Sequence, residues 1–343
     1  MTATRQAPRP VSWQPAAVVV LTVGLLWLFF RNVNYHEIGR AVGRAHPAWL
    51  GAAVLVTLQT YVLRACRWQA LLLPLGRARF RTALRSTVIG FTATFLLPGR
   101  VGEVLKPYLL ARREGFKIPA TFATVIVERL LDLTTVLLLF ACALPFVPGD
   151  VGTDVKWAGG LAAAASLVGL LTLFMCAGHP ERLGRWAGRV TRWLPERAAR
   201  AAGHLVRTFA EGLAVMRRPG PLVLAEAWTI LLWLSIALGI WITSAAFDLT
   251  FSFAGTFLVV TFLVVGVAAP TPGSVGGFHY FYLLAVTRFF GANPDTGAAA
   301  ALVLHLISNV PVTVFGLIFM SQEGLTLRGL KTLRQRAQAE ETA

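Results

Sequence analysis

Apolar residues gather along this chain in long blocks that short polar segments separate. The blocks are about 16 to 27 residues long, close to the roughly 20 residues with which an α-helix crosses about 30 Å of hydrocarbon. Runs such as LLWLFF at 25–30 and FLVVTFLVVGVAA at 257–269 do not alternate as the strands of a membrane β-barrel would. The pattern therefore predicts an all-α, polytopic integral membrane protein.

Six blocks are long enough for full spans, and two further stretches are interrupted by Pro-Gly. These stretches are 82–110 and 253–290, and in the first a helix of about 24 Å over 82–97 would end at LLPGR. Such a break is typical of a re-entrant hairpin. We therefore expect about eight membrane segments in one domain over 1–320, followed by a basic tail at 321–343. The predicted spans are 15–30, 47–63, 120–146, 157–176, 221–247 and 296–320.

The composition excludes an ordinary soluble domain, since 56% of the 343 residues are hydrophobic and only 14% are charged. A net charge of +16 would suit a nucleic-acid-binding protein, but no such motif accompanies it, and we expect no nucleic-acid partner. Lys and Arg instead collect on the cytoplasmic side of membrane proteins. The positions of Lys and Arg along the chain can therefore be used to predict the topology.

The charge distribution predicts an orientation. If the N-terminus is cytoplasmic and both broken stretches return to the side where they start, 25 Lys and Arg are cytoplasmic and 5 lie outside. We therefore expect a multi-pass protein of the cell membrane with both termini in the cytoplasm. The cytoplasmic parts would be 1–14, 64–81, 99–118, 177–220 and 321–343.

The basic connector 177–220 is the one long polar stretch of the chain. Leu205, Phe209, Leu213 and Met216 recur in it at helical spacing among arginines. This fits an amphipathic helix on anionic lipid, and it also fits a charged connector.

Two segments of the chain are similar to each other. Residues 98–110 read PGRVGEVLKPYLL and residues 272–284 read PGSVGGFHYFYLL, with seven of 13 positions identical. By the charge-derived topology, the first copy enters from the cytoplasm and the second from outside. Chance similarity of two Gly- and Pro-rich segments is the alternative. We favour an inverted repeat, which in transporters places a binding site near the bilayer midplane.

The glycines of the two copies are candidate binding residues. After each Pro-Gly break a new helix would offer unpaired backbone N–H groups, and Gly99, Gly102, Gly273 and Gly276 would let a ligand approach them closely. Phosphate is the natural ligand of such a helix N-terminus.

Eight ionisable residues lie within or beside the apolar blocks, four basic and four acidic. A charge at the bilayer centre costs about 2.5 to 3.5 kcal/mol on insertion scales, so these residues should pair inside the protein. Glu128 and Asp132 share one helix face, and Arg129 is expected to pair with Asp132. The set is either a structural network or a functional site. Its members are Arg85, Arg100, Glu103, Lys106, Glu128, Arg129, Asp132 and Glu226.

Arg100 is the sharpest candidate of this set, because it follows the first Pro-Gly break and could hold phosphate with two parallel hydrogen bonds. Its alternative role is to extend to the headgroups, as we expect of Arg64 and Arg67. Glu103, Lys106 and Arg129 join Arg100 as expected substrate-binding residues, and the other ionisable residues would form a charge or coupling network.

His279 and His305 lie in the second repeat and in the last span. Each is either a packing residue or a proton carrier, because histidine titrates near physiological pH. The three cysteines, Cys66, Cys142 and Cys176, are scattered over apolar segments and match neither a disulfide framework nor a zinc site. We expect no metal and no cofactor.

Four motifs resemble the lysylphosphatidylglycerol synthase transmembrane-region family, also called flippase-like domain proteins. They are RACRWQALLLPLG at 64–76, LLPGRVGEVLKPYLLARREG at 96–115, IVERLLDL at 126–133 and PTPGSVGGF at 270–278. The resemblance implies an eight-segment membrane domain that, in multidomain members, moves an aminoacylated phospholipid between leaflets. Other members accompany hopanoid or glycolipid pathways.

The chain departs from the family pattern at two positions. The family usually carries Glu where this chain has His279, and Arg where it has His305. We also expect no aminoacyl-transferase domain such as the multidomain members have, so the resemblance implies no lipid-modifying catalysis.

Two function classes follow. The first is a transporter, flippase or scramblase for an anionic phospholipid or a polyprenyl-linked lipid. The second is an accessory membrane subunit that recruits a lipid- or glycan-modifying enzyme. A third class, an intramembrane enzyme, lacks a recognisable nucleophile and base, and we expect no enzymatic activity.

Overall fold

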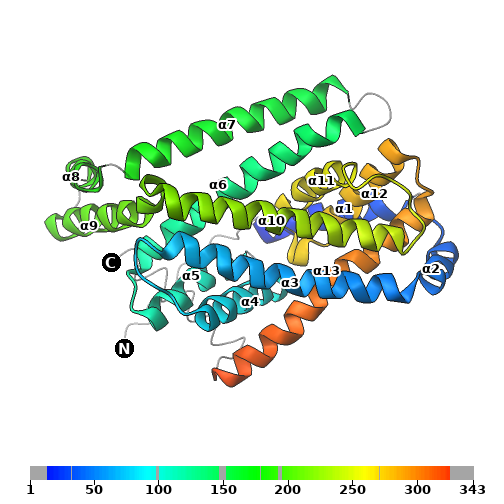
Figure 1. The fold of residues 1–343 in the computed structure, drawn as a ribbon, viewed down its shortest axis with the longest axis horizontal. Coiled ribbons are helices and arrows are strands. Elements are labelled where there is room, and N and C mark those ends of the chain that lie inside the picture. Colours follow the sequence, from blue (N-terminus) through cyan, green and yellow to red (C-terminus); the bar gives the residue numbers. More distant parts are fainter. Residues whose placement is uncertain are drawn as a thin grey trace, which may run out of the picture.

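The computed structural model describes residues 14–31, 33–97, 100–146, 152–177, 179–191, 195–269 and 271–324. Within these ranges the chain is helical and contains no strand, which confirms the all-α class (Figure 1). The helices are α1 Gln14–Phe30, α2 Tyr35–Arg44, α3 Pro47–Leu72, α4 Phe80–Leu96, α5 Val101–Glu114, α6 Ile118–Ala143, α7 Thr153–Ala177, α8 Pro180–Val190, α9 Glu196–Gly212, α10 Pro219–Ala245, α11 Thr256–Ala268, α12 Gly277–Phe290 and α13 Pro294–Gln322. Short 3-10 turns lie at Leu144–Phe146, Leu213–Arg217 and Pro272–Ser274.

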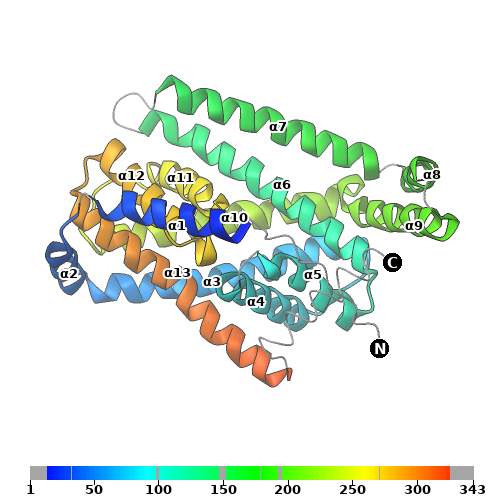
Figure 2. The same cartoon turned by 180° about the vertical axis from the view of Figure 1, so that it is seen from behind.

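Four helices of the described part are long and apolar enough to cross a membrane: α3, α7, α10 and α13. The longest, α13, has 29 residues and a length of about 43 Å. Helix α6 is also 26 residues long and runs beside α7 and α10 (Figure 2). The predicted outer loop 31–46 contains a further helix, α2. The count of about eight membrane segments stays a prediction.

The first interrupted stretch forms two short helices, α4 and α5, that turn back on each other. They cross at Gly102, where an added Cβ would lie 1.7 Å from the carbonyl oxygen of Gly90, so only glycine fits. At the open end of the pair, Arg79 Nε lies 3.1 Å from Glu114 Oε1. The predicted hairpin is therefore present, and its re-entrant course stays a prediction. Pro98 and Gly99 lie outside the described residues.

The second interrupted stretch forms a matching hairpin of α11 and α12. An added Cβ on Gly277 would lie 2.3 Å from the carbonyl oxygen of Gly266, so two glycines cross here as well. At the open end, the rings of Phe251 and Phe290 stack with centroids 4.8 Å apart. Each interrupted stretch therefore folds as a hairpin of two half-length helices.

The backbone at the two breaks supports the duplication. The residue that follows Pro-Gly is left-handed in both copies, with φ of 51° at Arg100 and 58° at Ser274. Only one other non-glycine residue in the described ranges, Asp248, has a positive φ. Because L-residues rarely adopt this conformation, its occurrence at corresponding positions argues against chance similarity.

The two hairpins open toward opposite ends of α13 (Figures 1 and 2). Arg85 Nη1 and Arg113, on α4 and α5, pair with Glu323, which directly follows α13. Helix α12 instead ends at Phe290, just before α13 begins at Pro294. The orientations are therefore opposite, which confirms the inverted repeat. The pair with Glu323 also places Arg85 at the end of the bundle, away from the break at the other end of α4.

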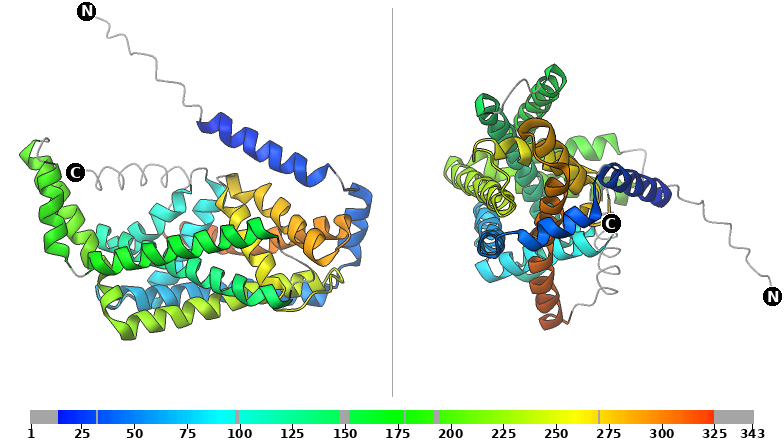
Figure 3. Two further views of the ribbon diagram at one scale, coloured as in Figure 1. Left: turned by 90° about the horizontal axis from the view of Figure 1, so that it is seen from above. Right: turned by 90° about the vertical axis from the view of Figure 1, so that its right-hand side faces the viewer.

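The connector 177–220 folds into α8, α9 and a 3-10 turn. Of the residues predicted to form an apolar face, Leu213 and Met216 are buried in the protein core. Gly212 packs against α6, since an added Cβ would lie 2.2 Å from the carbonyl oxygen of Ala120. The predicted face is therefore divided: Leu205 and Phe209 lie on α9, while Leu213 and Met216 lie in the 3-10 turn and contact protein. Figure 3 shows the hairpin of α8 and α9 lying across the end of the bundle.

Candidate functional site

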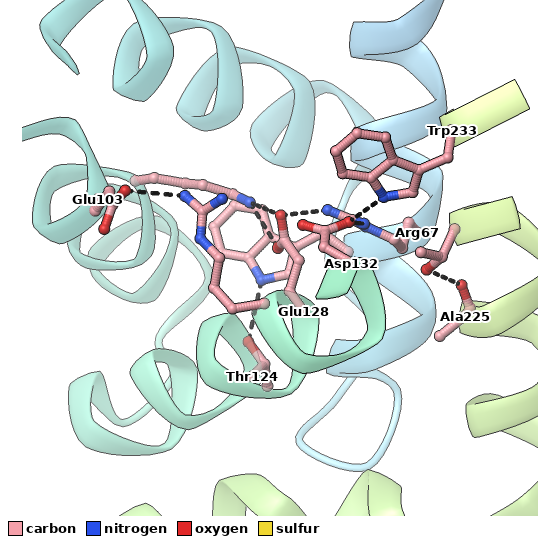
Figure 4. A network of polar contacts seen from close by, with 11 residues as sticks. Arg67, Glu103, Thr124, Glu128, Asp132, Ala225 and Trp233 are labelled. Carbon is pink, nitrogen blue, oxygen red and sulfur yellow. Dashed lines mark hydrogen bonds and ion pairs between the residues drawn. The ribbon is translucent and has the colours of Figure 1, made fainter. Parts of the chain in front are cut away.

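Four buried charges form a closed network between α3, α5 and α6 (Figure 4). Arg67, with no exposed surface, donates hydrogen bonds to Asp132 and, over 2.5 Å, to Glu128 Oε1. Lys106 Nζ lies 2.7 Å from Glu128 Oε2. Trp233 Nε1, from α10, donates to Asp132 Oδ1 over 2.9 Å. We call Arg67, Lys106, Glu128 and Asp132 the buried quartet; its two cations and two carboxylates leave no net charge.

A tryptophan of α3 packs against Lys106 of the quartet. Trp68 is fully buried, its Nε1 donates to Thr124 Oγ1 over 3.1 Å, and its ring centroid lies 4.4 Å from Lys106 Nζ. The ammonium group thus has a cation–π contact as well as a carboxylate. Mutual pairing of all four charges is what makes their burial tolerable.

The predicted role of Arg67 is wrong. We expected its side chain to reach the headgroups from a loop at 64–81, but α3 continues to Leu72 and holds Arg67 against α6. One sequence signal points to this arrangement. Glu128 and Asp132 share a helix face, so two adjacent carboxylates need cations from other helices.

A second, half-exposed group of charges adjoins the quartet. Glu103 Oε1 accepts hydrogen bonds from Arg129 Nη2 over 3.1 Å and from Arg100 Nη1 over 3.4 Å. The side chains of Arg100, Glu103 and Arg129 are 42%, 35% and 52% exposed. We call these three residues the arginine cluster; it carries one net positive charge.

The expected pair of Arg129 and Asp132 does not form. Arg129 pairs instead with Glu103 on α5, because Arg67 on α3 and Trp233 on α10 already occupy Asp132. The structure therefore separates Arg129 from the buried quartet and joins it to Arg100. Of the four expected substrate-binding side chains, three meet in the arginine cluster and Lys106 is buried behind it.

Arg100 also connects the two hairpins. Its Nη2 donates to the carbonyl oxygens of Val267 and Ala268, over 2.5 and 3.3 Å. These carbonyls belong to the last turn of α11, where a helix has unpaired acceptors and a partial negative charge. The two breaks of the repeat thus meet through one side chain.

The two histidines form hydrogen bonds with the backbone of the second break. His305 Nε2 lies 2.8 Å from the carbonyl oxygen of Gly273, and the Gly276 N–H group donates to His279 Nδ1 over 3.3 Å. The two rings are 4.6 Å apart between centroids, and both residues are buried. The ring of Phe95, from the tip of α4, lies 5.9 Å from that of His305, so the first hairpin touches the second here too.

The sequence matches the lysylphosphatidylglycerol synthase TM region over residues 16–316. The chain belongs to this family. It is 24% identical over 323 residues to a UPF0104 membrane protein of Methanothermobacter thermautotrophicus, a match that covers 88% of this chain and 93% of that protein. It is also 30% identical over 141 residues to the glycosyltransferase AglD of Haloferax volcanii, but the match covers 40% of this chain and only 22% of AglD.

Two of the predicted residues lie apart from the buried quartet and the arginine cluster. Arg85 donates to Gln322 over 2.7 Å and pairs with Glu323, at the end of α13. Glu226, on α10, accepts from Thr135 Oγ1 over 3.1 Å, and its second carboxylate oxygen is buried with no hydrogen-bond partner in the described structure. Neither belongs to the arginine cluster.

The other features of this family member lie elsewhere. A cavity of about 600 Å³ at the end where the α11–α12 hairpin opens is lined by residues such as Arg40, Asp248 and Asp295, and by none of the central charges. Within the described ranges, no three His, Cys, Asp or Glu side chains are grouped as ligands for a metal ion. The arginine cluster is therefore the strongest candidate site.

Proposed function

We propose that this chain moves an anionic phospholipid or lipid-linked intermediate between the two leaflets, and that Arg100 and Arg129 bind its phosphate. The observation that carries the proposal is the arginine cluster, half-exposed at the point where two oppositely oriented hairpins meet. The headgroup would pass between the hairpins while the acyl or prenyl tails stay in the bilayer.

The chemistry of the cluster fits a phosphate. Each guanidinium has five N–H donors, of which Glu103 takes one from each arginine and the carbonyls of Val267 and Ala268 take those of Arg100 Nη2. The remaining donors can bind phosphate oxygens in pairs. The first turn of α5, which starts directly after Arg100, adds the partial positive charge of a helix N-terminus.

The buried quartet has a supporting role in this proposal. It is neutral and inaccessible, so it offers no charge to a ligand. It fixes α5 and α6 against α3, and these two helices carry Glu103 and Arg129. The geometry of the arginine cluster therefore depends on the quartet behind it.

A translocation assay tests the proposal. Purified protein in liposomes should move a headgroup-labelled anionic phospholipid, and Arg100→Ala should slow this movement by roughly 10- to 100-fold, the value of a hydrogen bond to a charged group. Arg112→Ala is the matched control, since Arg112 is an exposed arginine of the same helix near its far end. A wild-type rate for Arg100→Ala would remove the cluster from the transport site.

A second candidate function is an accessory membrane subunit of a lipid- or glycan-modifying enzyme. The observation that favours it is the 30% identity with part of AglD, which is named as a glycosyltransferase. Translocation by the purified chain alone would argue against this function. Lipid movement that needs a co-purified enzyme would argue for it.

A further inference from the structure

Helix α8 has two different faces. One face packs against α9, where an added Cβ on Gly184 would lie 2.9 Å from the carbonyl oxygen of Gly203. Away from it lie Leu183, Trp186 and Val190, at positions i, i+3 and i+7. Trp186 is 60% exposed and Val190 53% exposed. We call these three residues the apolar stripe; Leu183 is partly buried, so Trp186 and Val190 form its exposed part.

Three arginines lie beside the apolar stripe. Arg182, Arg185 and Arg189 are all exposed, and within the described ranges none of them has an ion-pair partner. By contrast, Arg207 of α9 pairs with Glu181 over 3.5 Å. Helix α8 therefore combines unneutralised positive charge with an exposed aromatic residue, next to a face that is already fixed to the protein.

The direction of α8 suits a membrane surface. Figure 1 views α8 end-on, while α7 and α10 run along the long axis of the molecule. Helix α8 thus lies across the end of the spanning helices, and it begins three residues after α7 ends at Ala177. With the spanning helices along the bilayer normal, α8 is parallel to the bilayer plane.

We infer that α8 binds the surface of an anionic lipid bilayer. Its arginines contact phosphate groups, while the apolar stripe enters the boundary between headgroups and acyl chains. Tryptophan favours this boundary, and basic amphipathic helices bind anionic lipid through the same combination of charge and apolar area. The surface is separate from the proposed transport site, so either proposal can fail without the other.

An environment-sensitive fluorophore on α8 tests this inference. Val190→Cys, in the full chain with Cys66, Cys142 and Cys176 replaced by alanine, is labelled and placed in nanodiscs of phosphatidylcholine alone or with one third phosphatidylglycerol. We expect blue-shifted emission and quenching by bromine-labelled acyl chains, stronger with phosphatidylglycerol. Arg182→Gln with Arg189→Gln should lower the ratio of bilayer-bound to unbound α8 about fivefold per arginine, the attraction expected for one basic residue at an anionic surface.

Arg40→Gln with Arg44→Gln is the control. It removes the same charge from α2, at the opposite end of the molecule, and should leave the signal unchanged. The inference would be overturned if the emission showed a water-exposed fluorophore in both kinds of nanodisc. It would also be overturned if the emission shifted only when an acidic protein was added. Equal effects of the two double variants would mean that net charge, and not α8, attracts the lipid.

Discussion

Arg100 Nη2 donates a hydrogen bond of 2.5 Å to the backbone carbonyl oxygen of Val267, across 167 residues of sequence. One end of this bond lies at the first Pro-Gly break and the other at the end of α11, just before the second. A phosphate that takes the guanidinium donors of Arg100 competes with this carbonyl. In the proposed mechanism, ligand binding therefore loosens the contact between the two hairpins.

Charge and geometry at Arg100 can be separated by substitution. Arg100→Lys keeps the cation but loses the planar fork, so we expect partial lipid translocation. Arg100→Gln should retain very little, since a neutral amide cannot offset a phosphate charge where the dielectric constant is low. The measurement is the translocation rate per folded protein in liposomes. Equal rates for the two variants would show that charge is not what Arg100 contributes.

Arg67→Ala should unfold the protein at a much lower temperature. The change leaves Asp132 buried with Trp233 as its one donor among the described residues, and breaking a buried charge pair costs about 3 to 5 kcal/mol. Thermal unfolding in detergent measures this effect. Arg40→Ala is the control, because Arg40 is exposed and its pair with Glu37 is worth about 0 to 1 kcal/mol. Similar losses for both variants would contradict the central role of Arg67.

Arg129→Ala should behave in the opposite way. Its side chain is 52% exposed and paired only with Glu103 among the described residues, so we expect a stability change within about 1 kcal/mol. The rate of lipid translocation by Arg129→Ala should be lowered, as we expect for Arg100→Ala. The sequence alone predicts that Arg129→Ala destabilises the protein, because Asp132 would be left buried without a cation. A large drop in unfolding temperature with normal translocation would favour that earlier interpretation.

Gly102→Ala should disrupt the first hairpin. The new Cβ would meet the carbonyl oxygen of Gly90 at 1.7 Å, and overpacking of this kind costs about 1 to 3 kcal/mol. Gly39→Ala on α2 has no heavy atom within 4 Å of the new Cβ and should be neutral or slightly stabilising. Unfolding temperatures of both variants are the test, and an unperturbed Gly102→Ala would contradict the close crossing of α4 and α5.

The orientation can be tested at the two ends of α10. Arg218 and Thr250 are both exposed and lie on either side of this helix. In a chain without its native cysteines, an impermeant thiol reagent should label Thr250→Cys in intact cells, and Arg218→Cys only after lysis. The basis is the 25-to-5 distribution of Lys and Arg. Labelling in the reverse order would invert the predicted topology.

Sequence reasoning predicts the two hairpins because Pro-Gly ends a helix locally, whatever surrounds it. It also predicts their opposite orientation, because the distribution of Lys and Arg among the loops indicates on which side of the membrane each hairpin begins. It fails for Arg67, whose partners Glu128 and Asp132 lie 61 and 65 residues away. Whether an arginine at the end of an apolar block extends to water or is buried depends on which helices pack there, and no local pattern contains that information.

The same limit applies to the arginine cluster. Glu103 and Arg129 can each be identified as ionisable residues in apolar surroundings, but their pairing depends on how α5 is rotated against α6. Helical spacing within α6 alone favours Asp132 as the partner of Arg129. The contact between helices decides otherwise, because Arg67 and Trp233 already occupy Asp132.

The position of Arg67 has a consequence for biogenesis. During synthesis α3 leaves the ribosome before α6, and the carboxylate of Glu128 follows Arg67 by 61 residues. At about 5 to 20 residues per second, that delay is roughly 3 to 12 s. For this time Arg67 has no carboxylate partner, and an unpaired charge costs most where it is furthest from water. The buried quartet is therefore completed only after α6 has been made, and a chain truncated before Glu128 should leave Arg67 unpaired.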